Sequence, residues 1–156
     1  GRALSMDKET RSVYFTFFNE VGIIAQLSRA LMEARLPTGI TVPHFSVLNH
    51  LTRVHDGRTP LALARAFQVP KTTMTHTLSG LETQGFIELR RNPKDGRSKY
   101  VWMTQKGRDF HKEAIALLDP DIIEISMLIP EEQIQSLIPR LIKIREKLDA
   151  YRDASD

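Results

Sequence analysis

Cysteine is absent from the 156 residues of this chain. Its absence excludes disulfides, thiolate-bound metal sites, zinc-finger folds and redox sensing through a cysteine. A chain without cysteine is compatible with a reducing compartment, and we expect this protein to be cytoplasmic.

Long apolar runs are missing as well. No stretch of about 18 apolar residues exists, so we expect no segment to span a membrane and no membrane partner. No basic segment followed by an apolar stretch marks a secretory signal. The residues before Met6 are expected to be a cloning remnant. With 41% apolar and 26% charged residues, the composition is that of a globular protein with one domain, or one domain and an extension.

Signatures of catalysis are lacking too. The chain has no glycine-rich phosphate loop, no Gly-x-Ser-x-Gly motif and no cysteine nucleophile, so we expect neither an enzyme nor a bound cofactor. The five histidines form no helical i, i+4 pair beside a suitable carboxylate, so no metal site is expected. They are His44, His50, His55, His76 and His111.

The segment 86–104 carries the most information. Two short runs rich in aromatic and β-branched residues, Phe86–Arg91 and Tyr100–Met103, flank a loop that contains proline and glycine. This pattern predicts a β-hairpin. Its tip carries Lys94, Arg97 and Lys99 with Asp95 between them, and its base carries Arg90 and Arg91. A hairpin with cations at its tip can enter a groove lined by phosphates.

Positive charge is concentrated around this hairpin. Between Arg58 and Arg108, ten Lys and Arg face three Asp and Glu, whereas the remaining residues hold twelve and sixteen. Such an asymmetry favours phosphate binding by this segment, although a charge run alone is also typical of a solvated surface.

The residues before the hairpin predict a helix-turn-helix. Thr59 is a suitable N-cap and Pro60 suits the first helical position, so a short helix is expected at 61–67, with Leu61, Ala64 and Phe67 facing inward. After a turn at 68–70, a second helix is expected at 71–84. Burial of Met74, Leu78 and Leu81 would expose its N-terminal half, and Gly85 would end it in a left-handed conformation. The exposed half holds Lys71, Thr72, Thr73, Thr75 and His76.

Amphipathic helices are expected on both sides of this lobe. Apolar spacing predicts one long helix from about Asp7 to Arg35 and a second, capped by Thr41, to about Val54. Thr104 caps a later helix, Asp119-Pro120 interrupts it, and Pro130 precedes the last one. We divide the chain into an N-terminal helix at 1–40, a winged helix-turn-helix lobe at 41–104 and C-terminal helices at 105–156. The fold class expected is mainly α with a small β-hairpin wing.

The terminal helices present more apolar surface than one small lobe covers. An intertwined homodimer would bury that surface, and a two-fold dimer would present two reading heads. A monomer whose terminal helices pack back on its own core is the alternative.

Several motifs in order resemble the MarR family of regulators. They are Pro60-Leu-Ala-Leu-Ala64, Val69-Pro-Lys-Thr-Thr-Met74, Leu81-Glu-Thr-Gln-Gly85-Phe86, Asp95-Gly-Arg97 and Thr104-Gln-Lys-Gly107. The resemblance covers about residues 10–150. It implies a homodimeric winged-helix transcription regulator that binds double-stranded DNA at pseudo-palindromic operators. It also implies relief by a small, frequently aromatic effector.

The resemblance also assigns residues. Arg97 would enter the minor groove, while the second helix of the motif would enter the major groove. Asp95 is expected to form an ion pair that holds Arg97 or a neighbouring arginine in an extended geometry. The DNA-binding site is expected to comprise Lys71, Thr72, Thr73, Thr75, His76, Arg90, Lys94, Asp95, Arg97 and Lys99. His76 stands where the family usually has arginine, and Gly80 where it often has a long polar residue. This helix is therefore less basic than the family's. Indirect readout through the wing is expected to contribute more to recognition than direct readout by the helix.

An effector would lie in a cleft beside the first two helices. We expect Phe18, His44 and Phe45 to line it, although a Phe-rich stripe at helical spacing is more often dimer core. Two other functions stay open: a winged-helix module that binds a protein, and a ligand- or metal-sensing dimer without an operator.

Overall fold

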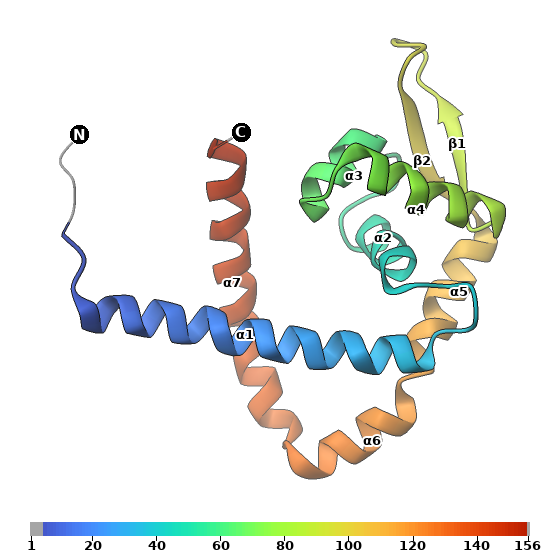
Figure 1. Ribbon diagram of the computed structural model, residues 1–156. Coiled ribbons are helices and arrows are strands. Elements are labelled where there is room, and N and C mark those ends of the chain that lie inside the picture. The colour runs from blue at the N-terminus through green and yellow to red at the C-terminus, as the bar shows by residue number, and fades with distance from the viewer. Residues whose placement is uncertain (1–4, 156) are drawn as a thin grey trace. The chain divides into compact units, whose positions relative to one another are not determined.

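The computed structural model describes residues 5–155, so most of the segment before Met6 lies outside the described residues. The chain divides into two compact units, one ending at Leu118 and one beginning at Asp119. The first unit holds five helices and one hairpin, in the order α1 (Lys8–Arg35), α2 (Val42–Arg53), α3 (Pro60–Phe67), α4 (Lys71–Thr83), β1 (Ile87–Arg91), β2 (Lys99–Met103) and α5 (Gln105–Ala116). The second holds α6 (Asp119–Leu128) and α7 (Glu131–Ser155). The expected fold class, mainly α with a small β-hairpin, is confirmed (Figure 1).

Four helices begin at a side-chain cap, and three of these caps, Thr41, Thr59 and Thr104, were predicted from the sequence. The side chains of Asp7, Thr41, Thr59 and Thr104 each accept a backbone N–H from the first turn of the helix that follows. Each such bond satisfies a donor that the helix itself leaves unpaired. Gly85 has a φ of +79°, the left-handed conformation predicted at the end of α4. The interruption expected at Asp119-Pro120 is also present, since α5 ends at Ala116 and α6 starts at Asp119.

The core of the first unit lies between α2, α3, α4 and the hairpin. Its buried members include Val47, Leu48, Leu51, Leu63, Met74, Leu78, Leu81, Phe86, Ile87, Val101 and Met103. Burying an aliphatic or aromatic side chain of this size stabilises a fold by roughly 1.5–3 kcal/mol, so this cluster fixes α4 relative to α2 and the hairpin.

One predicted core position is wrong. Leu61 is 55% exposed, and Leu63 is buried in its place. The helix α3 has only eight residues. In two turns, apolar residues at 61, 64 and 67 fit helical spacing as well as 63, 64 and 67 do, so periodicity does not fix which face is buried.

The hairpin is antiparallel and pairs Ile87 with Met103 and Arg91 with Lys99. Figure 1 shows its tip projecting beyond α4. The buried residues Ile87, Val101 and Met103 hold its base on the core, whereas residues 93–97 at the tip are all exposed.

The two helices of the second unit carry many exposed apolar side chains. They include Ile122, Ile123, Met127 and Leu128 of α6, and Ile134, Leu137, Ile138, Leu141 and Leu148 of α7. Among the described residues, no helix is both long and apolar enough to cross a bilayer.

Candidate nucleic-acid interface

The helix α4 separates its apolar and polar residues on two faces. Met74, Thr77, Leu78 and Leu81 are buried against the core. The exposed face contains all five residues singled out in the sequence: Lys71, Thr72, Thr73, Thr75 and His76. A helix held on its apolar face presents the other face to a groove as a rigid surface.

The start of α4 lacks a side-chain cap. Its N-cap is Pro70, which provides no side-chain hydrogen bond to the first turn. The backbone N–H groups there point away from the helix, and a helix start carries the positive end of the helix dipole. This end of α4 is therefore suited to a phosphate group, which Lys71 would also attract.

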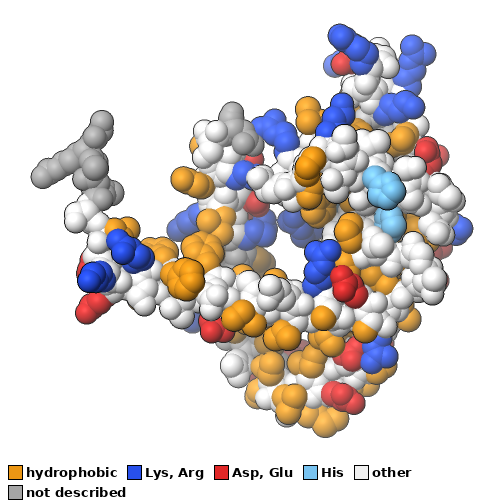
Figure 2. Space-filling model, in the orientation of Figure 1, with side chains coloured by type: hydrophobic (Ala, Val, Ile, Leu, Met, Phe, Trp, Pro, Cys, Tyr) orange, Lys and Arg blue, Asp and Glu red, His pale blue; other side chains and the backbone are white. Residues whose placement is uncertain are grey.

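We define the basic wing tip as Lys94, Arg97 and Lys99. All three residues are exposed to solvent. The side chain of Arg97 is 98% exposed. Figure 2 shows Lys and Arg side chains gathered at the end of the hairpin labelled in Figure 1. The carboxylate of Asp95 accepts the backbone N–H of Arg97 at 3.0 Å and lies 3.8 Å from its Nε. The ion pair expected between these two residues is present.

Arg90 differs from the tip residues because it is held within the hairpin. Its Nε lies 2.6 Å from Oε1 of Glu88, and its guanidinium carbon lies 4.5 Å from the centre of the Trp102 ring. Such contacts favour one orientation of the guanidinium. Arg90 therefore stiffens the base of the wing in this structure.

The wing is anchored by residues that the sequence analysis did not single out. Val101 donates its N–H to the Arg58 carbonyl at 2.8 Å, and Gly57 donates to the Val101 carbonyl at 2.9 Å. The Asp56 carboxylate accepts the N–H of Met103 at 2.9 Å. The partners of Asp56 and Gly57 lie more than forty residues away along the chain, so no local sequence pattern indicated these contacts.

A second anchor joins α4, the wing and α5. Thr104 accepts the N–H of Gly107 at 3.0 Å and donates its hydroxyl to the Gly85 carbonyl at 2.6 Å. Lys106 donates from Nζ to the Gln84 carbonyl at 2.8 Å. The end of α4 is thus hydrogen-bonded to the start of α5, which directly follows the second strand of the wing.

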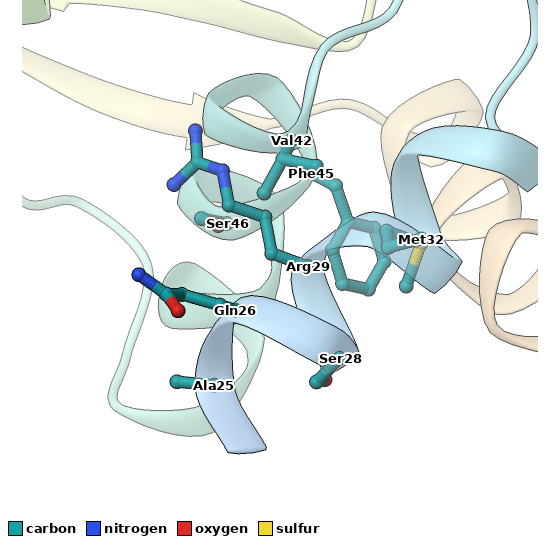
Figure 3. A pocket seen from close by; sticks show the side chains of 8 residues that line it. All are labelled: Ala25, Gln26, Ser28, Arg29, Met32, Val42, Phe45 and Ser46. Carbon is teal, nitrogen blue, oxygen red and sulfur yellow. The ribbon is translucent and has the colours of Figure 1, made fainter. Parts of the chain in front are cut away.

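Two open cavities lie beside α1 in the first unit. The first, of about 440 Å³, is lined by Ala25, Gln26, Ser28, Arg29, Met32, Val42, Phe45 and Ser46. Figure 3 shows Phe45 and Met32 on one side of it, with Arg29 and Gln26 on the other. The second, of about 550 Å³, is lined by Arg29, Glu33, Ile40, Thr41, Val42, Pro43, His44, Thr73, His76 and Thr77.

The three residues expected to line one effector cleft are not brought together. Phe45 lines the first cavity and His44 the second, whereas Phe18 lines neither and is 48% exposed on α1. The second cavity also contains Thr73 and His76 of α4. Sequence spacing alone gave no sign that α1, the start of α2 and α4 share a cavity.

Two histidines have perturbed acidity. Burial lowers the pKa of His44 below its ordinary value, and the nearby His76 lowers it further. Burial also lowers the pKa of His111, which is stacked on Phe45 and lies 3.0 Å from the Asn49 side-chain oxygen. Within residues 5–155, no three His, Asp or Glu side chains are grouped as metal ligands.

A helix-turn-helix followed by an anchored basic hairpin defines a winged helix-turn-helix protein. Comparison with known families agrees, because residues 38–98 match the model of the MarR family. The resemblance to the MarR family noted from the sequence is thereby confirmed for this winged-helix segment.

Solved structures with this fold cover nearly the whole chain. The transcriptional regulator BldR from Sulfolobus solfataricus is 24% identical, with a TM-score of 0.72 over 91% of this chain and 99% of that one. A structure of MarR is 20% identical, with a TM-score of 0.76 over 97% and 99%. A mutant MarR from E. coli complexed with operator DNA is 23% identical, with a TM-score of 0.65 over 89% and 99%. At these identities the likeness establishes the fold.

Proposed function

We propose that this protein is a transcription regulator that binds double-stranded DNA through α4 and the wing. The observation that carries the proposal is the joint presentation of the polar face of α4 and the basic wing tip by one rigid scaffold. The two are held by the same core and by the Thr104 hydrogen bonds. Operator DNA in the complex of the related E. coli protein supports this assignment.

The two elements read different features of DNA. The residues Thr72, Thr73, Thr75 and His76 face a major groove, where a threonine methyl can meet a thymine methyl and a hydroxyl can bond a base or phosphate. Arg97 enters the adjacent minor groove, where a narrow A·T tract concentrates negative potential. Lys71, Lys94 and Lys99 contact phosphates and set the register. Arg90 supports the wing, and Asp95 orients Arg97.

The protein acts as a homodimer on a pseudo-palindromic operator. The exposed apolar side chains of α1 support this assembly, and they include Val13, Tyr14, Phe15, Phe18, Val21, Ile24 and Leu27. The helices α6 and α7 contribute a second set of exposed apolar side chains. Many exposed apolar side chains on one helix of a folded chain are typical of an interface. Two-fold symmetry then places two reading heads about one helical turn of DNA apart.

An effector relieves DNA binding. The cavity lined by Phe45 and Met32 on one side and by Arg29 and Gln26 on the other suits a small aromatic molecule with one polar group. A ligand held between α1 and α2 would favour dimers whose reading heads do not match the groove spacing.

Selection of duplexes from a random pool by the purified protein tests the proposal directly. We expect enrichment of an inverted repeat, and retardation of the selected duplex that weakens steeply as salt rises. Recovery of no preferred sequence, together with binding that ignores salt, would contradict operator recognition. That result would favour a protein-binding module instead.

A further inference from the structure

The start of α2 and the last turn of α4 meet at His44 and Gly80. A methyl group built on Gly80 would lie 2.5 Å from Nε2 of His44 and 3.3 Å from its Cε1. Real side chains do not tolerate such a distance, so the imidazole occupies the space that a Cβ at this position would need. Glycine inside a helix is unfavourable by about 1 kcal/mol relative to alanine. The close approach of His44 gives a physical reason for this residue.

The opposite edge of the same ring closes the cap of α2. Nδ1 of His44 accepts the backbone N–H of Thr41 at 2.9 Å, and the Thr41 hydroxyl lies 3.0 Å from it. The backbone N–H of His44 in turn points to the Thr41 hydroxyl at 3.4 Å, which completes a reciprocal capping box. Because Nδ1 accepts a hydrogen bond, the ring is neutral and carries its proton on Nε2.

His44 is therefore held at two edges, by the cap on one side and by α4 on the other. The charged and titratable groups that share its cavity are Arg29 and Glu33 of α1, which pair with each other at 3.4 Å, and His76 of α4. Protonation would turn Nδ1 from an acceptor into a donor that faces the Thr41 N–H. It would also add a positive charge beside His76. Burial and His76 both lower the pKa of His44, which agrees with this geometry.

We propose that His44 is a positioning residue for DNA binding. Its neutral ring packs against Gly80 and fixes the position of α4, and protonation of the ring disrupts this packing. The inference rests on the proposed function, since α4 is the element that would enter the major groove. His44 touches no DNA in this account and acts through α4. Acidification therefore weakens DNA binding through His44, because a proton on its ring disturbs the position of α4.

The variant His44→Gln tests the role of the His44 proton. Glutamine at the third position of a capping box supplies the same acceptor to the N-cap N–H, and it does not titrate. The affinity of both proteins for the selected duplex is measured by fluorescence anisotropy from pH 8.0 to 5.5 at constant ionic strength. Because the two proteins differ only at residue 44, the ratio of their affinities isolates the contribution of His44. We expect the unaltered protein to lose at least about threefold relative to His44→Gln as the pH falls. A ratio that stays constant with pH overturns the proposal.

The variant Gly80→Ala tests the contact itself. A methyl group there forces the ring or the helix to move, so DNA affinity at pH 8.0 should fall by about tenfold. Removing the ring as well, in His44→Ala/Gly80→Ala, makes room for the methyl group. We expect this double variant to bind more tightly than the product of the two single effects predicts. If the losses of DNA affinity are additive, the proposed packing of His44 against Gly80 is overturned.

Thermal unfolding of the unaltered protein, His44→Ala, Gly80→Ala and the double variant tests the contact without DNA. The two substitutions should be non-additive in stability for the same steric reason, and circular dichroism verifies that each variant folds. Failure of the unaltered protein to bind any selected duplex would contradict the proposed function. If the stability losses of the two single variants add up to that of the double variant, the His44–Gly80 contact is contradicted. The two failures are therefore distinguishable.

Discussion

Asp95 and Arg97 are joined by a hydrogen bond and an ion pair at the tip of the wing. One carboxylate oxygen of Asp95 accepts the backbone N–H of Arg97 at 3.0 Å and also lies 3.8 Å from Nε of its side chain. We expect the acid to make no DNA contact of its own, because it would repel phosphate. Its hydrogen bond and its ion pair bias both the backbone turn and the direction of an arginine that is otherwise solvated.

Replacement of Arg97 by alanine should weaken binding to the selected duplex by roughly 1–3 kcal/mol and leave the fold intact. The physical reason is the loss of a cation from a narrow minor groove. Fluorescence anisotropy measures the affinity, and circular dichroism measures the fold. Lys112→Ala is the matched control, since it removes one exposed positive charge from α5. Equal effects of the two substitutions would reduce the role of Arg97 to net charge.

Asp95→Ala distinguishes an orienting acid from a merely repulsive one. Loss of a negative charge near phosphate would by itself strengthen binding, whereas loss of the hold on Arg97 should weaken it. We expect weaker binding. Asp95→Asn keeps an oxygen for the Arg97 N–H and removes the ion pair, so it should fall between the alanine variant and the unaltered protein. Tighter binding by Asp95→Ala would show that the acid only opposes the DNA.

The salt dependence of binding should report the phosphate contacts of the wing. Each neutralised phosphate contributes about −0.9 to the slope of log affinity against log salt concentration. Lys94→Ala should therefore make the slope shallower by about one, with a similar loss for all duplexes. Titrations at several salt concentrations with a selected and a scrambled duplex measure both effects. An unchanged slope would remove Lys94 from the interface.

The Thr104 hydroxyl should matter for stability. It caps α5 and bonds the Gly85 carbonyl, so Thr104→Ala should lower the free energy of unfolding by about 1–2 kcal/mol. Urea unfolding followed by circular dichroism measures this change. Thr104→Ser keeps the hydroxyl and should recover most of the loss. If serine proves as destabilising as alanine, the methyl group rather than the two hydrogen bonds is responsible.

Stability should fall on mild acidification because of His111. Burial holds its pKa below 6.5 in the folded protein, so the unfolded chain binds more protons below that pH. The stability that the neutral ring contributes is complete above about pH 6.5 and is lost as the pH falls toward the lowered pKa. Urea unfolding at pH 8, 6.5 and 5.5 measures it. His111→Gln removes this titration, and identical pH profiles for both proteins would contradict the assignment.

Assembly through the apolar face of α1 is open to a direct test. Phe15 and Phe18 are 67% and 48% exposed, and the double change of both to aspartate places two charges in the proposed interface. Size-exclusion chromatography with light scattering should then give a monomer in place of a dimer. The control Asn19→Asp adds a charge at an exposed polar position of the same helix and should leave the dimer intact. A dimer that survives the double change would exclude this face.

The helix boundaries and the wing were predictable because their causes are local. Asp7, Thr41, Thr59 and Thr104 each bond an N–H two or three residues away, and Gly85 meets its conformational need alone. The cations of the wing tip were visible for the same reason. A loop between two β-type runs must be exposed, whatever the rest of the chain does.

The sequence by itself determined the order of the elements, the caps and the concentration of positive charge on one hairpin. Only the tertiary structure decided that Leu63 rather than Leu61 is buried, that Arg90 is held by Glu88 and Trp102, and that His44 meets Gly80. The Arg90 contacts depend on strand register and the other two on how helices pack. Such packing is set by the summed burial of many side chains far apart in sequence, which no local pattern encodes.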